Sequence, residues 1–570
     1  MKNMKWQALL LTLLIIALIT GCTGTTPEKK VEQAEETTTI QDQTTHTNEY
    51  GWDVPKETLK FTVYAGTGDQ TERDKQAAPM KQFYKDKFNV DIDIVVYSLD
   101  MTEQLNLMLA SNNYPEIITW MPDDMAEKFI AQKRVWDLTE AIDKYGPNIK
   151  RRLGKYLNLM RSEDNSIKKL PIGWGKTPNV AGFDFACRYD LWKETGLPMY
   201  KTLDDYYNVL KTIVAKKPTL ESGEKVYAIS DNSGGTNIMN AMLAAYGYKN
   251  GFRVDKTTGE FTYWTNTPEG IEIVEYINRF YRDGLIDPDF LNNSYEIMLT
   301  KMFNEKIIGN IGVWWHSWTG GHEKWGVEDP DYTIEKRFMN ATVEVPGVTE
   351  PTYLGSNFIG SSRFIITNKV KDKALMENII KFVDWEYTEL GNLIVGNGYP
   401  DPGNIWDIID GKWIYKDNTF DNATKNENVH AVKEKYGSGQ VWLATSGGWI
   451  EDDRIDPRVT RVSAYDFWPI NEKGEFLDEG VRICWSNVKA EPWDSTLFQV
   501  TFPGNDPISQ INQTIKDAVK TEFAKIITAN THEEMVKLYN EAKIKLNSLG
   551  LEELTRYNQE QYRLNAEKIK

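Results

Sequence analysis

Residues 58–64 read TLKFTVY and residues 90–97 read VDIDIVVY, so apolar and polar side chains alternate in both segments. This period of two residues predicts two half-buried strands. Between them, residues 70–88 repeat apolar side chains at helical spacing, and a second helix is predicted over residues 102–111. Residues 115–120, which read PEIITW, complete a β-α-β-α-β order. That order predicts a parallel sheet with helices packed on its faces.

A second α/β region begins near residue 180 and extends the fold beyond this first sheet. The carboxyl-terminal tail from residue 508 to residue 569 reads as nearly all helical. A body of about 520 residues exceeds what one hydrophobic core usually serves, so two or more domains are expected. Ligands of parallel sheets bind beyond the carboxyl ends of the strands. Trp120, at the end of the third strand, is therefore a candidate ligand-binding residue.

The amino-terminal residues indicate export and anchoring. A short basic start precedes an apolar run over residues 8–19, which is too short to span a membrane comfortably. The run ends in Ile-Thr-Gly followed by Cys22, which resembles the bacterial lipobox, where the Cys thiol is diacylated and the signal is cut immediately before the Cys. We therefore predict a signal peptide over residues 1–21 and a lipid on Cys22. Residues 22–55 have almost no aliphatic side chains and are predicted to be a disordered tether.

The composition argues against several classes of protein. The net charge of −17 disfavours nucleic acid as a partner. No nucleotide-binding P-loop and no zinc-protease motif is present, and we predict neither a metal nor a cofactor. Residues 451–456 are rich in acids, but adjacent carboxylates point apart, so a solvated loop is favoured over a glycosidase site. Cys187 and Cys484 could form a disulfide, although two buried thiols are the more frequent arrangement.

Several segments carry a family resemblance. Residues 188–198 read RYDLWKETGLP, residues 202–207 read TLDDYY, and residues 286–290 read IDPDF. They resemble the extracellular solute-binding proteins of bacterial ABC importers, family 1 type, in particular the long lipoproteins of Gram-positive bacteria. The resemblance implies a two-lobed, periplasmic-binding-protein-like α/β fold of class II type, with a ligand cleft between the lobes and a helical carboxyl-terminal extension. It also implies lobes that close on the ligand and dock on permease subunits.

The resemblance also implies approximate lobe boundaries, and this sequence departs from the pattern of its relatives at one loop. The first lobe is predicted over residues 56–178 and 340–400, and the second over residues 179–339 and 401–570. Oligosaccharide-binding relatives often carry a calcium loop after the helix that begins near Thr202. Here residues 217–225 read KPTLESGEK, without the alternating Asp and Asn ligands that calcium needs, so we predict no calcium at this loop.

Aromatic side chains supply the positive signal for a ligand. The chain has 19 Trp residues, and three of them follow an apolar strand and precede two glycines. Indole rings stack on the C–H faces of sugars, whose hydroxyls need polar partners. The alternative for any single Trp is a place in the hydrophobic core. The aromatic candidates are Trp120, Trp174, Trp314, Trp315, Trp318, Tyr399 and Trp449.

Four polar residues complete the predicted site. Asp184 is expected to bond sugar hydroxyls, while Lys176, Arg188 or Arg363 could also bind a uronic carboxylate. For Arg188 the favoured alternative is a structural ion pair with a neighbouring Asp. Arg363 follows a segment rich in Gly and Ser that is predicted to cross between the lobes.

Together these features predict a monomeric, lipid-anchored receptor on the extracellular face of the cell membrane. It would capture a carbohydrate, in particular an oligosaccharide, and deliver it to an ABC permease without covalent chemistry. Two alternatives stay open at this point: a peptide or other solute as the ligand of the same importer, and a cell-surface carbohydrate-active enzyme.

Overall fold

The computed structural model describes most of the chain from Thr44 onward. Residues 1–43, with the predicted signal and Cys22, form a separate unit outside the described part. Six other residues named above also lie outside it: Lys176, Trp314, Trp315, Trp318, Trp449 and Cys484. The described residues are 44–174, 182–313, 316, 336, 338–339, 341–352, 355–356, 359–404, 406–415, 435–437, 439–445, 454, 493–504 and 506–570.

The first lobe is built on a five-stranded sheet with the strand order β4-β3-β5-β13-β6. Strand β3 is parallel to both β4 and β5, whereas β13 is antiparallel to β5 and β6. The predicted β-α-β-α-β order is therefore confirmed. The strands are β3 (Leu59–Thr67), β4 (Val90–Tyr97), β5 (Ile117–Pro122), β6 (Leu170–Pro171) and β13 (Ser362–Ile366).

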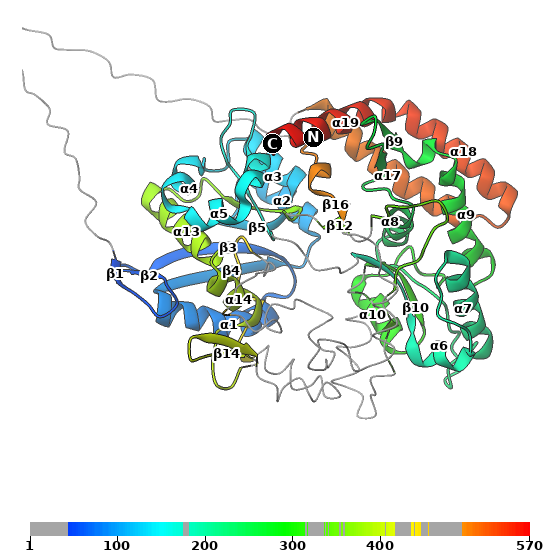
Figure 1. Ribbon diagram of the computed structural model, residues 1–570, viewed down its shortest axis with the longest axis horizontal. Helices are drawn as coiled ribbons and strands as arrows, with labels where there is room; N and C mark the ends of the chain where they lie inside the picture. The colour runs from blue at the N-terminus through cyan, green and yellow to red at the C-terminus, as the bar shows by residue number, and fades with distance from the viewer. Residues whose placement is uncertain are drawn as a thin grey trace, which may run out of the picture. The chain divides into compact units, whose positions relative to one another are not determined.

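Helices cover both faces of this sheet (Figure 1). Alternate residues of β3 explain why: Val63 packs with α1, α4, α5 and α13, while Tyr64 packs on the other face with α2 and α3. Asp69 and Asp100 cap the first two helices through their carboxylates. The helices are α1 (Gln70–Phe88), α2 (Met101–Ser111), α3 (Asp123–Ala131), α4 (Thr139–Tyr145), α5 (Pro147–Leu153), η1 (Gly154–Met160), α13 (Lys373–Glu386) and α14 (Glu389–Asn397).

Two additions to this lobe come from outside its predicted boundaries. Strands β1 (Thr44–Thr47) and β2 (Asp53–Pro55) pair, so ordered structure begins inside the predicted tether. Trp406, Trp413 and Leu443 pack in the same hydrophobic core as β3, although they follow the predicted boundary at residue 400. Trp406 and Trp413 lie on a hairpin formed by β14 (Trp406–Ile409) and β15 (Lys412–Tyr415).

The second lobe has its own core around a sheet with the order β10-β7-β11. All three strands pair antiparallel, and a separate hairpin joins β8 to β9. Thr202 and Asp205 form a capping box at the start of α7, in which each side chain accepts a hydrogen bond from the other residue's backbone N–H. The elements are β7 (Phe183–Arg188), α6 (Tyr189–Thr195), α7 (Leu203–Lys216), α8 (Thr236–Ala245), β8 (Phe252–Val254), β9 (Phe261–Tyr263), η2 (Trp264–Asn266), α9 (Glu269–Arg282), α10 (Tyr295–Phe303), β10 (Gly309–Val313) and β11 (Phe338–Met339).

The carboxyl-terminal tail is helical, as predicted, and packs on the second core. Helices α17, α18 and α19, orange to red in Figure 1, contact one another, and α17 and α18 also contact α9. Asn565 of α19 donates to the carbonyls of Leu497 and Gln499, so the tail also contacts the segment that follows β16. The last elements are β12 (Gly355–Ser356), β16 (Trp493–Asp494), η6 (Thr496–Phe498), α17 (Pro507–Ile527), α18 (His532–Ser548) and α19 (Leu551–Lys568). Within the described residues, no helix is long and apolar enough to cross a membrane.

Candidate functional site

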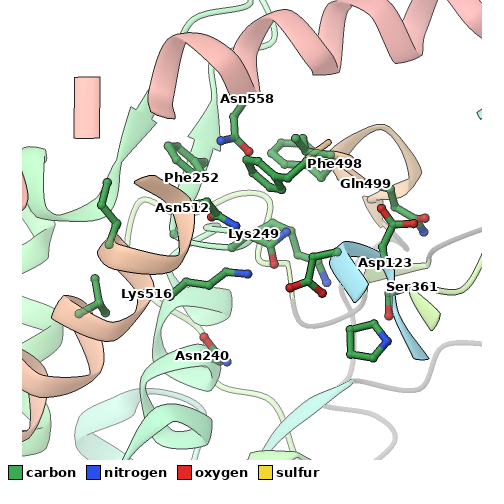
Figure 2. A pocket seen from close by; sticks show the side chains of 18 of the residues that line it. Asp123, Asn240, Lys249, Phe252, Ser361, Phe498, Gln499, Asn512, Lys516 and Asn558 are labelled. Carbon is green, nitrogen blue, oxygen red and sulfur yellow. The ribbon is translucent and has the colours of Figure 1, made fainter. Parts of the chain in front are cut away.

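A cavity of about 720 Å³ is lined by residues of both lobes (Figure 2). This volume lies within the range of roughly 300–1,000 Å³ that is usual for small-ligand sites. One side, which we name the first wall, consists of residues at the carboxyl end of β5, the start of β13 and the segment after β16: Trp120, Asp123, Asp124, Ser361, Arg363 and Gln499. The opposite side, the second wall, consists of residues from α8, the tight turn that leads into β8, the start of β8 and α17: Asn240, Lys249, Phe252, Asn512, Lys516 and Lys520.

The first wall follows from the sheet topology. Trp120 lies near the carboxyl end of β5, and Ser362 of the antiparallel strand β13 pairs with Pro122, the last residue of β5, so both strands reach the cavity at the same edge. Trp120 has φ +59°, a left-handed conformation that is strained for a bulky side chain. Its ring lies 5.5 Å from that of Trp442. Its buried indole N–H has no hydrogen-bond partner among the described residues.

A buried ion network lies behind this wall. Arg363 donates through Nε to Asp123 and through Nη2 to Gln499 at 2.9 Å, while Nη1 donates to the carbonyl of Gly360 at 2.6 Å. Lys169 donates to Asp123 at 2.6 Å and to Glu127 at 2.7 Å. Burial would raise the pKa of Asp123, but Arg363 and Lys169 outweigh it and hold that pKa well below its ordinary value. The charges of this network are therefore committed to one another.

The second wall offers polar groups without internal partners. Figure 2 shows Lys249 and Lys516 on the side opposite Asp123 and Gln499. The amides of Asn240 and Asn512 make no hydrogen bond within the described part of the chain, although Asn512 is buried. Aromatic rings surround these groups and come from the hairpin, η2 and the segment before α17: Phe252, Tyr263, Trp264, Phe498 and Phe502. The arrangement can bind a ligand that combines apolar faces with hydrogen-bonding groups.

Residues 69–389 match the family described as bacterial extracellular solute-binding protein, which is more than half of the chain. The chain belongs to this family. It is also similar to Lipoprotein LipO of Bacillus subtilis (strain 168), with 22% identity over 374 residues, which cover 62% of this chain and 67% of that protein. The family resemblance stated from the sequence is confirmed.

Solved structures show the same fold at low sequence identity. The alginate-binding protein AlgQ2, without calcium ion, aligns with a TM-score of 0.60 and 18% identity over 90% of this chain and 99% of that one. The ABC-transporter substrate binding protein FusA of S. pneumoniae, in complex with kestose, aligns with a TM-score of 0.59 and 17% identity over 89% and 99%. The N-glycan transport solute binding protein NgtS of Streptococcus pneumoniae gives 0.54 and 16% over 89% and 99%. The predicted two-lobed fold is confirmed.

Two of the predicted site residues of this solute-binding protein line the cavity, and four lie elsewhere. Trp120 and Arg363 line it, although the guanidinium of Arg363 is committed to protein partners. Trp174 lies in the core of the first lobe, where its ring stacks on Tyr387 at 5.3 Å and Arg152 lies 5.0 Å from it. Tyr399 stacks on the ring of Phe83 in the first lobe, with 4.7 Å between the ring centroids. Trp174 therefore takes the alternative place in the hydrophobic core, since the residue is only 5% exposed.

The remaining predicted residues belong to the second lobe. Asp184 is buried and accepts a hydrogen bond from Asn310 at 2.7 Å. Arg188 forms the structural ion pair that was its favoured alternative, with bonds of 2.9 and 2.6 Å to Asp190. In the loop 217–225, Glu224 bonds Lys306 at 2.8 Å rather than facing other acids. Within the described ranges, no group of three or more His, Cys, Asp or Glu could hold a metal ion.

Sequence reasoning missed the second wall entirely. Its residues come from a hairpin turn and from helix α17, which are separated by more than two hundred residues. One local signal was present. Asn250-Gly251 is a strong two-residue hairpin motif, and such a turn fixes the backbone position of the residue before it, Lys249. Nothing in the pattern of α17 distinguishes the face with Lys516 from an ordinary solvated face.

Proposed function

We propose that this solute-binding protein is a lipid-anchored receptor that delivers an oligosaccharide to the permease of an ABC importer. Membership of the family supports the binding role, and similarity to Lipoprotein LipO supports an anchored form. The ligands named for the structural neighbours are alginate, kestose and N-glycans, and they support a carbohydrate. In this proposal Cys22 carries the lipid, the chain acts as a monomer, and the site lies on the extracellular face of the membrane.

The observation that carries the proposal is the combined lining of the cavity. Sugar rings pack their C–H faces on aromatic side chains, while their hydroxyls exchange hydrogen bonds with amides. The cavity supplies both kinds of group, with Phe252 and Phe498 among its rings and Asn240 and Asn512 among its amides. Since these residues stand opposite Trp120 of the other lobe, a bound sugar would contact both lobes and favour their closed arrangement.

The proposal also assigns a role to the predicted cluster of Trp residues. Trp314, Trp315 and Trp318 follow strand β10, and Asp184 lies on the neighbouring strand β7. In the proposal, these Trp residues and Trp449 extend the aromatic lining for a longer oligosaccharide. Lys176 remains a proposed partner of the ligand on the segment that follows Trp174.

A binding screen tests this proposal. Thermal shift and calorimetry with neutral and acidic oligosaccharides should find at least one ligand that raises the melting temperature. Asn240→Ala should then weaken binding by about two- to tenfold, because a neutral hydrogen bond contributes about 0.5–1.5 kcal/mol. The matched control is Asn208→Ala, an exposed asparagine on α7 far from the cavity in sequence and absent from its lining.

Mass spectrometry of the incubated oligosaccharides separates the alternatives. Unchanged ligand supports a receptor, whereas cleaved products would indicate a carbohydrate-active enzyme. Stabilisation by peptides and by no sugar would overturn the carbohydrate part of the proposal. For the anchor, Cys22→Ser should abolish incorporation of labelled palmitate in growing cells, and a variant that still incorporates the label would contradict lipidation of Cys22.

A further inference from the structure

Lys249 holds a fixed position at the rim of the second wall. It precedes a two-residue hairpin turn, in which the backbones of Lys249 and Phe252 exchange hydrogen bonds of 2.8 and 2.9 Å. Asn250 and Gly251 have φ values of +53° and +82°, as a type I′ turn requires. A Cβ on Gly251 would lie 2.5 Å from the ring of Tyr263, so the turn is packed tightly against its neighbour strand. The base of the Lys249 side chain is therefore preorganised.

The ammonium of Lys249 has no counter-ion among the residues that the structure describes. Its side chain is partly buried, lines the cavity, and makes no ion pair or hydrogen bond through Nζ within the described residues. Burial lowers the pKa of Lys249 below its ordinary value. A desolvated cation without a partner is unfavourable, so an anionic group placed beside it would be stabilised.

The charges around Lys249 favour an anion as well. Lys516 and Lys520, one turn apart on α17, line the same wall and have no ion pair among the described residues. Of the acids that line the cavity, Asp123 is committed to Arg363 and Lys169. The two others, Asp124 and Asp517, are outnumbered by the three lysines that line the described part of the cavity. This local excess of cations stands out in a chain whose net charge is −17.

We propose that the ligand is an acidic oligosaccharide and that its carboxylate binds Lys249. This inference rests on the proposed function, since it names the class of sugar for the same cavity. In this arrangement the ammonium of Lys249 donates to the carboxylate, while Asn240 and Asn512 bond neighbouring hydroxyls. Lys516 and Lys520 stand nearer the solvent and attract the anion before it binds.

The test compares matched acidic and neutral sugars. Calorimetry uses trisaccharides of galacturonate, glucuronate and mannuronate and the methyl ester of each, with the wild-type chain, Lys249→Met, Lys249→Arg and the control Lys75→Met. Lys75 is an exposed lysine on α1 that does not line the cavity. We expect at least one acid to bind more tightly than its ester, by about 10- to 100-fold, which corresponds to about 1.5–3 kcal/mol for a hydrogen bond to a charged group.

Lys249→Met should remove that preference by weakening the binding of the acid much more than that of the ester, while Lys249→Arg should keep part of the preference and Lys75→Met all of it. Equal affinity for acids and esters in the wild-type chain would overturn the inference and leave the proposed function intact. The same holds if a neutral sugar or a sulfated trisaccharide without carboxylates is the tighter ligand. If no sugar of any kind binds, the proposed function fails, and the inference fails with it.

Discussion

Glu386 provides the sharpest prediction about stability, because a fully buried carboxyl holds the segment beside the cavity. The side chain has no exposed surface and accepts backbone hydrogen bonds of 3.0 Å from Leu443 and from Ala444. This segment carries Trp442, whose ring lies beside Trp120. Burial raises the pKa of Glu386 to about 8, although the two backbone hydrogen bonds act in the opposite direction.

The magnitude follows from the difference between the folded and unfolded pKa values. In the unfolded chain the carboxyl titrates near 4.5, and in the folded chain near 8. Between these values the folded state binds the extra proton, so the free energy of unfolding falls as the pH rises from about 4.5 to about 8. At about 1.4 kcal/mol per pH unit, the fall contributed by this one group amounts to about 5 kcal/mol. Tyr84 and Tyr387 face the carboxyl, and their own pKa values are raised well above 10, so neither offsets the change.

Urea unfolding at pH 5, 7 and 9 of the wild-type chain and Glu386→Gln measures this effect. Other groups titrate in both proteins, so the relevant quantity is the difference between their unfolding free energies at each pH. We expect Glu386→Gln to gain stability relative to the wild type as the pH rises, by several kcal/mol in total. Glu103→Gln, an exposed glutamate on α2, serves as the matched control and should show no such trend. A difference that stays constant from pH 5 to pH 9 would refute the assignment of a neutral, buried Glu386.

Three substitutions test the packing around the cavity. Trp174→Ala should lower the free energy of unfolding by about 3–5 kcal/mol in urea, because it empties a buried site; a stable variant with weakened ligand binding would instead restore its predicted place in the site. Asp123→Asn should cost about 3–5 kcal/mol by leaving buried cations without their counter-ion, and an unchanged urea midpoint would contradict this. Gly251→Ala should lower the melting temperature more than Gly259→Ala, since both have positive φ but only the first would clash with a ring. Equal shifts would show that the clash is relieved.

The first sheet could be predicted from the sequence because its strands are buried in a regular way. Alternation in residues 58–64 and 90–97 reports the two faces of the sheet, and the structure places Val63 and Tyr64 on opposite faces. The helical tail was equally readable from its apolar spacing. The sequence did not show to which lobe the residues after 400 belong, because an apolar residue such as Trp406 indicates burial without indicating which core it joins.

The site was only partly predictable, for a related reason. Trp120 was found from a rule about strand ends, which depends on topology that the sequence reveals. Trp174 has the same chemistry and stands between two glycines in the sequence, but its ring stacks inside the first core. Arg363 reaches the cavity, yet its donors are used by Asp123 and Gln499, partners that no local pattern indicates. Side-chain type predicts what a residue can bind, whereas the folded neighbours decide whether it is available.

The two walls of the cavity differ in the polar groups that are available to a ligand, and this difference bears on how a ligand would be held. The first wall carries a charged network that is satisfied internally, so it can meet a ligand mainly through Trp120, the hydroxyl of Ser361 and the carboxylate of Asp124. On the second wall, Lys249 and Asn512 have no hydrogen-bond or ion-pair partner in the described part of the chain, so burying them is favourable only when a ligand supplies acceptors. A ligand would therefore gain most of its polar binding energy on the second lobe. Contact with the first lobe would then add apolar area and favour closure without requiring the buried network to open.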